Sequence, residues 1–522
     1  MLWIALHLPL LSLESFAATL HHGLDGAASD TPLALTDLQG ITSANAAAQA
    51  LGVKPGLKRA TALALAPQLL LGQADPARDA QCLLAVAHAA LAFTPSVTIA
   101  PATAAETSPH TVLLEVQASL RYFGGRQALL QRLHATLAPL GHRVCTVCAP
   151  TAQGAALLAR VHSHLHCADR HALAAALDAA PVWLLGPGRE HWEALQGMGL
   201  RTLADLRSLP RAGLARRFGE ALLDELDRAR GERPDPRQFI ELAPSFDSRL
   251  ELFARADSTE QVLHGAHMLL LRMVVWLAAR HAFVRRFTLL MLHEGRQRSD
   301  VPVPRETRLE IALAEPSRDA DHLQVLLRER LAQVQLPAPT LDLQLLASDL
   351  AQRAAPNGEL FPSAGTEREG LTRLIERLQA RLGAAQVRQL LQVEDHRPER
   401  GSQACSASPP ARSRPAGGPK ARGQPARASG PAAAAAQRPV LLLEPPEGLH
   451  ERQSRPLLDG RPLQLLSGPE RIESGWWDAG LVERDYFIAQ TLDGALVWIY
   501  RARLPLSPAG GAPGWFLHGR FA

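Results

Sequence analysis

Ser248–Ala254 (SRLELFA), Thr259–His281 (TEQVLHGAHMLLLRMVVWLAARH) and Arg285–His293 (RRFTLLMLH) follow one another as a strand, a helix and a strand. The strands alternate apolar and polar residues, whereas the middle segment is long and apolar with helical spacing. A second strand–helix–strand set follows in Thr307–Ala314, Ala320–Val334 and Thr340–Ala347. The β-α-β-β-α-β order is that of the split βαβ pattern, so we predict a ferredoxin-like domain over residues 240–350.

The region before this domain divides into two parts. Residues 1–180 mix short apolar strands with Ala- and Leu-rich helices, which predicts an α+β region. The expected strands are Leu2–Leu8, Val97–Ala100, Val112–Gln117 and Arg143–Cys148, and the expected helices are Thr42–Leu51, Ala77–Ala92 and Arg126–Leu137. The apolar start lacks basic residues and is interrupted by Pro9 and Glu14, so a buried strand explains it better than a signal peptide does.

Residues 181–235 form a compact unit of short helices separated by glycines. The turn MGLRT, Met198–Thr202, looks like the hairpin of a helix-hairpin-helix motif. In that motif backbone N–H groups at a helix start face a DNA phosphate without reading the base sequence. We therefore expect DNA contacts from Gly197, Gly199, Arg201 and Thr202; a plain helical hairpin is the alternative, and these residues alone do not separate the two.

The clearest boundary lies near residue 401. Residues 401–438 are rich in Ser, Pro, Gly, Ala and Arg and lack apolar anchors, which predicts a disordered basic linker. It carries six basic residues and no acid, so without it the net charge of +4 would become −2. The linker is a soluble spacer or a segment that touches DNA phosphate. Residues 351–400, before it, contain an expected helix at Glu367–Gly383.

The segment after the linker, residues 439–522, is rich in aromatics and turns and is expected to be a small β-rich unit. Paired Trp476 and Trp477 in a glycine-bounded turn predict an interface anchor, or alternatively the core of this unit. The segment is short and has few other large apolar groups, so we expect it to need a partner for full order.

Composition limits the function classes. Of 522 residues, 47% are hydrophobic and 20% charged, which is typical of folded domains. A net charge of +4 on such a chain does not by itself indicate nucleic-acid binding. Five cysteines exclude a disulfide scaffold and are typical of a reducing cytoplasm. The sequence contains no run of 18 apolar residues, so we predict no membrane-spanning helix.

The cysteine and histidine pattern does not predict a metal site. Cys145 and Cys148 precede His162, His164, His166 and Cys167. If residues 143–148 form a strand, Cys145 and Cys148 point to opposite faces. The later residues come from one short stretch that we expect to be helical. Buried thiols are the better interpretation, and we expect no metal and no cofactor.

The order of these parts resembles the Y-family translesion DNA polymerases, with palm and fingers, thumb, and little finger. Ile41–Asn45 through Val53 looks like the fingers segment, and Phe93–Pro95 with Val97 looks like the entry to the strand before the second acidic motif. Met198–Leu206 with Arg217–Gly219 looks like the thumb. The resemblance covers residues 1 to about 350 and implies DNA as a partner.

The departures from that family concern its chemistry. Polymerisation needs carboxylates that hold two Mg²⁺ ions. The family's acidic positions look like Leu8, Leu10, His110 and Thr111 here, and its triphosphate-binding positions look like Ala46 and Gln49. We therefore expect no polymerase activity. The alternative is an active but atypical polymerase that uses Glu14 and Glu115, although Glu115 resembles a structural acid beyond the catalytic pair.

The tail narrows the resemblance to the ImuB subfamily of polymerase-like proteins. Gly468–Asp478, Arg484–Phe487 and Trp515–Gly519 look like its C-terminal segment. This resemblance implies a scaffold in damage-induced translesion synthesis. Its expected partners are the β sliding clamp, an ImuA-type protein related to RecA, and an error-prone C-family polymerase; a clamp-independent DNA-binding protein is the remaining alternative.

A clamp pocket accepts a short extended peptide with a leading amide and two apolar anchors. Asn357, Leu360 and Phe361, between Pro356 and Pro362, are the expected clamp-binding residues. Gln344–Leu346 and Gln464–Leu466 are competing motifs, and the first of them is expected to lie in a core strand.

Overall fold

The computed structural model describes residues 1–20, 31–102, 109–186, 191–294, 304–352, 364–407, 438–439, 441–478, 480–503 and 514–521. The chain divides into two compact units, Met1–Arg381 and Leu382–Ala522, called here the N-terminal and C-terminal units. In the described part, one helix, Thr259–Ala279, has the length and hydropathy of a membrane span, and two thirds of its most apolar window is buried inside the protein.

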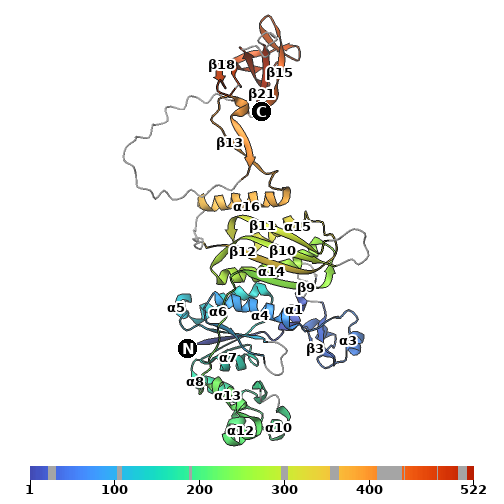
Figure 1. Cartoon of the computed structure of the whole chain (residues 1–522), viewed down its shortest axis with the longest axis vertical. Coiled ribbons are helices and arrows are strands. Elements are labelled where there is room, and N and C mark those ends of the chain that lie inside the picture. The colour runs from blue at the N-terminus through green and yellow to red at the C-terminus, as the bar shows by residue number, and fades with distance from the viewer. Residues whose placement is uncertain are drawn as a thin grey trace, which may run out of the picture. The chain divides into compact units, whose positions relative to one another are not determined.

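The palm-like region is a five-stranded sheet with helices on both faces (Figure 1). Its strands lie in the order β5 (Val97–Ile99), β6 (Thr111–Glu115), β1 (Trp3–His7), β7 (Cys145–Ala149) and β8 (His164–His166). Alternate residues of the buried central strand β1 pack into two cores. Ile4 and Leu6 contact the side of α4 (Pro76–Leu91) and α6 (Arg126–Leu137), whereas Trp3 and Ala5 contact the side of α7 (Ala152–Ala159) and α8 (Arg170–Ala179).

The fingers-like region is a small sheet in the order β3 (Ile41–Ala44), β2 (Leu33–Thr36) and β4 (Leu70–Gly72), with α2 (Ala46–Ala50) and α3 (Arg59–Leu65). The expected helix Thr42–Leu51 is therefore half wrong, because its first residues pair with β2 as a strand. Asn45 begins the true helix, since its side chain accepts a hydrogen bond from the Ala48 N–H. The short helix α1 (Leu11–Ala17) connects β1 to this region.

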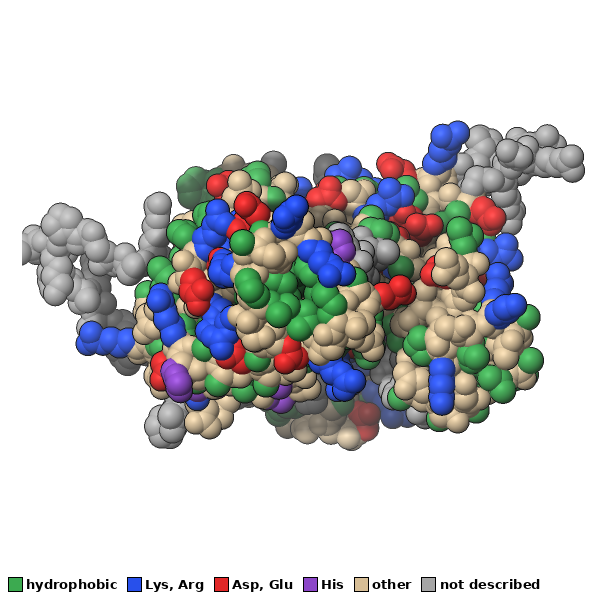
Figure 2. All heavy atoms as spheres, turned by 90° about the horizontal axis from the view of Figure 1, so that it is seen from below, with side chains coloured by type: hydrophobic (Ala, Val, Ile, Leu, Met, Phe, Trp, Pro, Cys, Tyr) green, Lys and Arg blue, Asp and Glu red, His purple; other side chains and the backbone are tan. Residues whose placement is uncertain are grey.

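Four short helices form the thumb-like region: α10 (Trp192–Gly197), α11 (Leu203–Ser208), α12 (Arg211–Phe218) and α13 (Glu220–Arg230). They make two consecutive helical hairpins, whose turns contain Gly199 at φ +81° and Gly219 at φ +86°. This region lies at the bottom of Figure 1. The face seen from that side carries a hydrophobic patch with both basic and acidic side chains around it (Figure 2).

The predicted β-α-β-β-α-β order of elements is confirmed, although the first and third strands lie at the edges of the sheet, where a ferredoxin-like sheet has the second and fourth. The antiparallel sheet of this domain has the order β11 (Glu306–Ser317), β10 (Ala282–His293), β12 (Thr340–Gln352) and β9 (Phe246–Ala256), and α14 (Thr259–Ala279) and α15 (Ala320–Leu331) pack on it. Helix α16 (Ala364–Leu382) follows and lies against α15 and the edge strand β11 (Figure 1).

The C-terminal unit is rich in β-structure, as expected. A seven-stranded sheet has the order β17 (Arg461–Pro462), β16 (Arg455–Leu458), β15 (Leu441–Arg452), β21 (Trp515–Arg520), β20 (Leu496–Ala502), β19 (Val482–Gln490) and β18 (Gln464–Ser474). A separate hairpin consists of β13 (Arg388–Gln392) and β14 (Ser402–Ser406). Ser402–Ser406 was expected at the start of the linker; it is a strand because its backbone pairs with β13.

The C-terminal unit has two apolar cores of its own. In one of them Tyr486, Trp498 and Tyr500 are at most 3% exposed, and the Tyr486 and Trp498 rings stack at 4.0 Å. The expectation that this segment lacks the apolar groups to order itself is therefore wrong. These three aromatics lie on β19 and β20, where the alternation and pairing of the strands place them on one face.

Candidate functional site

The positions that look like the Y-family acids lie together at one end of the palm sheet. β1 pairs with β6 so that His7 faces Thr111, and the Leu8 N–H donates to the His110 carbonyl at 2.9 Å. His7 Nδ1 lies 3.0 Å from Thr111 Oγ1, and the His7 and His110 rings are 6.5 Å apart. Leu8 is fully buried. Imidazole, hydroxyl and apolar groups thus occupy these positions, and Leu10 lies one residue before α1.

The positions that look like the triphosphate contacts lie on α2. Ala46 and Gln49 are both exposed. The Gln49 side-chain amide donates to the Ala44 carbonyl at 2.7 Å, so it bonds to the backbone just before its own helix. Neither side chain carries the positive charge that a triphosphate needs.

Glu14 and Glu115, the two acids of the alternative hypothesis, lie at opposite ends of the sheet. Glu14 accepts the Arg143 N–H at 3.1 Å and lies 3.2 Å from His142 Nδ1. These two residues directly precede β7, whose first residue, Cys145, pairs with His7 at the end of β1. Glu115 faces Trp3 at the other end of β1 and accepts the N–H groups of Leu2 and Gln117. Four residues of strand, about 13 Å, separate these ends, so the two carboxylates cannot share one metal ion.

A buried polar network explains the position of Glu14. Burial works against the charged form of His142, but hydrogen bonds to Cys82 and Glu14 prevail and raise the pKa of His142 to about 9. Cys82 in turn accepts a hydrogen bond from Arg272 Nη2 on α14 at 3.2 Å. Glu14 therefore belongs to a network that joins the palm-like region to the little-finger-like domain.

The cysteines also follow the strand geometry. Val147 packs into one core of the palm sheet and Cys148 into the other, so the odd and even residues of β7 face opposite sides. The expectation that His162–Cys167 are helical is wrong, because His164–His166 pair with β7 as the parallel strand β8. Among the residues that the structure describes, no group of three His, Cys, Asp or Glu side chains could hold a metal ion.

In the thumb-like region the structure places Gly197 at the end of α10 and Thr202 at the cap of α11. The Asp205 carboxylate accepts the N–H groups of Arg201 at 3.0 Å and Thr202 at 2.9 Å. These hydrogen bonds, that of Thr202 first, lower the pKa of Asp205. An acid thus already occupies N–H groups that a phosphate would use at this hairpin.

The second thumb hairpin has a more favourable charge, which the sequence reasoning missed. Arg216 and Arg217 are exposed in the last turn of α12, directly before Gly219. The signal was present in the sequence as the pair of arginines before Phe218 and Gly219, and only its resemblance to the family was noted.

The tryptophan pair lies in a turn between β18 and β19, and it is exposed rather than part of a core. Trp476 is 78% exposed and Trp477 56% exposed. Their rings are 5.4 Å apart and almost perpendicular. Exposed large aromatics in a folded protein mark an interaction surface.

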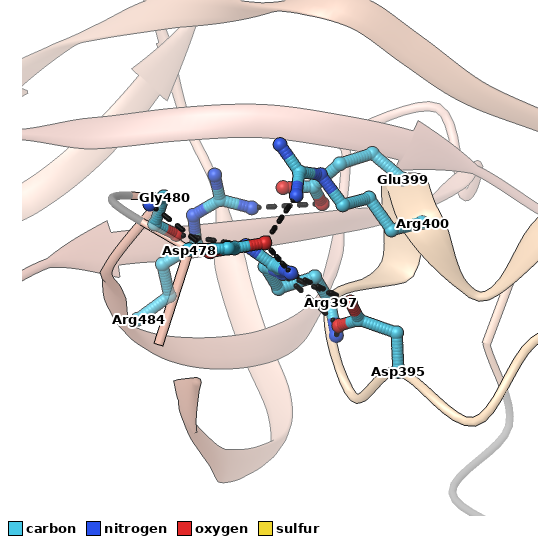
Figure 3. Close-up of polar contacts among 7 residues, drawn as sticks. All are labelled: Asp395, Arg397, Glu399, Arg400, Asp478, Gly480 and Arg484. Atoms are coloured by element: carbon cyan, nitrogen blue, oxygen red, sulfur yellow. Dashed lines mark hydrogen bonds and ion pairs between the residues drawn. The ribbon is translucent and has the colours of Figure 1, made fainter. Parts of the chain in front are cut away.

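An ion-pair cluster holds this turn in place (Figure 3). The Arg397 guanidinium, only 2% exposed, donates to Asp395 Oδ2 at 2.7 Å, to Asp478 Oδ2 at 2.6 Å and to the Gly480 carbonyl at 3.1 Å. Arg400 also donates to Asp478. The hydrogen bond from Arg397, followed by that of the Gly480 N–H, lowers the pKa of Asp478 to about 2, so the cluster stays charged in the physiological range.

The same guanidinium supports the tryptophans directly. Its central carbon lies 5.6 Å from the centre of the Trp477 ring, within the range of a cation–π contact. Gly475 has φ +85°, and a Cβ there would overlap the Gly480 carbonyl and lie 2.5 Å from Arg397 Nη1. Only glycine therefore fits at this point of the turn. The turn and the arginine segment are 81 residues apart, and no local sequence signal joins them.

The three candidate clamp motifs differ in accessibility. Asn357, Leu360 and Phe361 lie outside the described residues. Gln344–Leu346 lies in β12 between β10 and β9, where Leu345 is fully buried, so it is not available as a peptide. Gln464–Leu466 begins the edge strand β18, and Leu465 and Leu466 are 44% and 49% exposed.

Comparison with known proteins identifies the family through sequence. No family model matches the chain. Solved structures of Y-family polymerases, a Dbh ternary complex and DinB from Sulfolobus solfataricus, are 17% identical, and each aligns over 67% of this chain and 99% of its own with a TM-score of 0.36. The assignment rests instead on sequence. Protein ImuB from two strains of Caulobacter vibrioides is 30% identical over 498 residues, which is 90% of this chain and 100% of the relative. The chain therefore belongs to the ImuB family.

Proposed function

We propose that this protein is a non-catalytic, polymerase-like adaptor in damage-induced translesion DNA synthesis. It docks on the β sliding clamp and recruits an error-prone C-family polymerase and an ImuA-type partner. The observation that carries the proposal is the end of β1 and β6, where Leu8, His110 and Thr111 stand at the positions that resemble the family's acids. Two-metal catalysis requires anionic oxygens there, and these side chains supply none.

Primer extension tests the loss of catalysis. With Mg²⁺ or Mn²⁺ and a primed template, we expect no incorporation by the wild-type protein. Glu14→Ala and Glu115→Ala are the informative variants. If the wild-type protein incorporated nucleotides and either variant did not, the alternative of an atypical polymerase would be established. The distance between the two acids along β1 and β6 argues for the negative outcome.

Recruitment is assigned to the tryptophan turn. A binding group that is already rigid loses less conformational entropy on association, and Arg397 and Gly475 fix the turn before any partner binds. Tryptophan is also among the residues that most often dominate interface energies. Trp476 and Trp477 therefore form the proposed anchor for the protein partners.

Clamp docking is assigned to Asn357, Leu360 and Phe361, with Gln464–Leu466 as the competing site. Titration of the full chain with its cognate clamp separates the two. We expect binding that is lost in Leu360→Ala/Phe361→Ala. It should be kept in Leu465→Ala/Leu466→Ala, which serves as the control with two apolar residues replaced. The reverse pattern would move the site to β18, where both leucines are exposed. No binding would leave the clamp-independent alternative.

DNA contact is assigned to the thumb hairpins. Gly197, Gly199, Arg201 and Thr202 remain the proposed contacts, although Asp205 competes with phosphate at the first hairpin. The affinity for primed DNA should fall with salt, and the slope of log K against log salt concentration should scale with the number of phosphates that the protein neutralises. Arg216→Ala/Arg217→Ala should lower the slope of this dependence if the second hairpin contributes.

A further inference from the structure

A cavity of about 210 Å³ lies beside the little-finger-like domain, where α16 meets the end of β11 and the start of α15. Phe283 and Pro316 give it an apolar lining, and α16 contributes Thr372 and Glu376. A cavity of about 150 Å³ holds a benzene-sized molecule, so this one has room for roughly eight or nine non-hydrogen atoms. It is therefore large enough for a small organic ligand.

The acidic side chains of the cavity are already engaged within the protein. Glu376 Oε1 accepts a backbone N–H of β11 at 2.6 Å, and its Oε2 lies 2.8 Å from His322 Nε2 on α15, which anchors α16. Asp319 Oδ2 pairs with Arg373 Nη2 at 3.1 Å. Glu315 also has an interaction partner. A ligand with a positive charge would have to compete with these contacts for its carboxylates.

Arg318 is the cation of the cavity that has no such partner. Its guanidinium lies over the Phe283 ring, 4.7 Å from the ring centre. Within the described residues it has neither a carboxylate at ion-pair distance nor a hydrogen-bond acceptor. Arg373, the other arginine of the cavity, is paired. The unpaired guanidinium charge is thus that of Arg318, and it favours an anion.

Thr372 is a second unsatisfied group. This residue lines the cavity and is 2% exposed, and its Oγ1 has no hydrogen-bond partner among the described residues. A buried hydroxyl without a partner is unfavourable, because folding removes its hydrogen bonds to water. An acceptor atom of a ligand would satisfy it. Thr372 and Arg318 therefore indicate, independently of each other, a ligand that accepts hydrogen bonds.

We propose that this cavity binds a small organic acid, with its carboxylate at Arg318 and a flat apolar body against Pro316 and Phe283. One guanidinium donates two parallel hydrogen bonds to a carboxylate, and the Phe283 ring already supports the Arg318 guanidinium from one side. The Thr372 hydroxyl supplies a further donor. Because α16 forms part of the lining, a bound acid also ties α16 more firmly to the domain.

The test is calorimetric titration of the full chain with benzoate, whose size matches the cavity. Benzamide is the uncharged probe of the same shape, and inorganic phosphate is an anion without an apolar body. A tripeptide that ends in phenylalanine carries its carboxylate on a chain terminus and exceeds the cavity. Arg318→Gln removes the charge, Thr372→Val removes the hydroxyl, and Thr372→Ser keeps it. Arg308→Gln is the control, because Arg308 is an exposed arginine elsewhere on β11.

We expect saturable binding of benzoate with a Kd of about 1 mM or tighter. Benzamide, phosphate and the tripeptide should each bind at least about tenfold more weakly. Arg318→Gln should weaken benzoate binding by about tenfold and Thr372→Val by about fivefold, whereas Thr372→Ser and Arg308→Gln should keep the wild-type affinity.

Urea unfolding of the free chain separates loss of binding from loss of folding. Thr372→Val should be at least as stable as wild type, because the unsatisfied hydroxyl is gone, so its weaker affinity is not a folding defect. Absence of saturation with benzoate would overturn the proposal. So would equally tight binding of benzamide, phosphate or the tripeptide, or full affinity in either Arg318→Gln or Thr372→Val.

Discussion

Replacing both exposed tryptophans, Trp476→Ala/Trp477→Ala, should remove partner binding and leave the fold intact. At about 200 Å² per ring, exposures of 78% and 56% leave roughly 270 Å² of aromatic surface for a partner to cover. At ~25 cal/mol per Å², complete burial of that surface is worth ~7 kcal/mol as an upper bound. Incomplete burial and the ordering of the partner reduce this value, so we expect a loss of about 3 kcal/mol, or about 150-fold in Kd.

The assay is calorimetric titration of the full chain with each proposed partner, the C-family polymerase and the ImuA-type protein. Leu492→Ala is the matched control, because this side chain is 70% exposed in a different turn of the same unit. The free energy of unfolding should change by less than about 0.5 kcal/mol, as is usual for exposed side chains. Unchanged affinity for both partners in the tryptophan variant, with the unit still folded, would refute the assignment of the turn as their anchor.

Three further predictions concern stability and positioning. Gly475→Ala should displace the turn, because its Cβ overlaps the Gly480 carbonyl, and should weaken partner binding in the same titration while both tryptophans remain; unchanged binding would show that turn geometry is unimportant. Glu376→Ala should lower the free energy of unfolding by about 1–3 kcal/mol, measured by urea titration, since the Ala314 N–H loses its acceptor; a neutral effect would argue against the anchoring of α16. Burial lowers the pKa of His88 from 6.5 to about 4. The free energy of unfolding therefore has its full value above pH 6.5 and falls as the pH decreases to 4. At 1.36 kcal/mol per pKa unit, this loss is about 3 kcal/mol. Unfolding of His88→Asn should lack this component of the pH dependence, and an identical pH profile would contradict it.

All six elements of the little-finger-like domain could be predicted, with ends that differ by at most about five residues, and the reason is the length of their signals. Its strands alternate over many residues, and α14 is a long apolar helix with a Ser258 cap, so local propensity and packing agree. β8 could not be predicted, because it has three residues, two of them histidine, and exists only through its pairing with β7. β3 was assigned to a helix because an Ala-rich run follows it. The Asn45 cap was the available signal for the true boundary.

The candidate sites show the same division between local and distant information. The lack of carboxylates at Leu8, His110 and Thr111 could be read from the sequence, because single positions in recognisable strands decide it. The support of the tryptophan turn could not, because Arg397 meets Asp478 only after the chain folds. A buried arginine requires a carboxylate, but the sequence does not say which one.

This contact changes where the partner-binding part of the chain must begin. A boundary after the linker, at residue 439, separates Asp478 from Arg397 and removes the guanidinium that supports Trp477. The compact unit instead starts at Leu382, so the residues before the linker are structural parts of the tail. The linker thus joins two halves of one folded unit and is not a tether between a polymerase-like body and an independent tail. A deletion of residues 439–522 would therefore remove the tryptophans and also leave Arg397 and Asp395 without the turn that they hold.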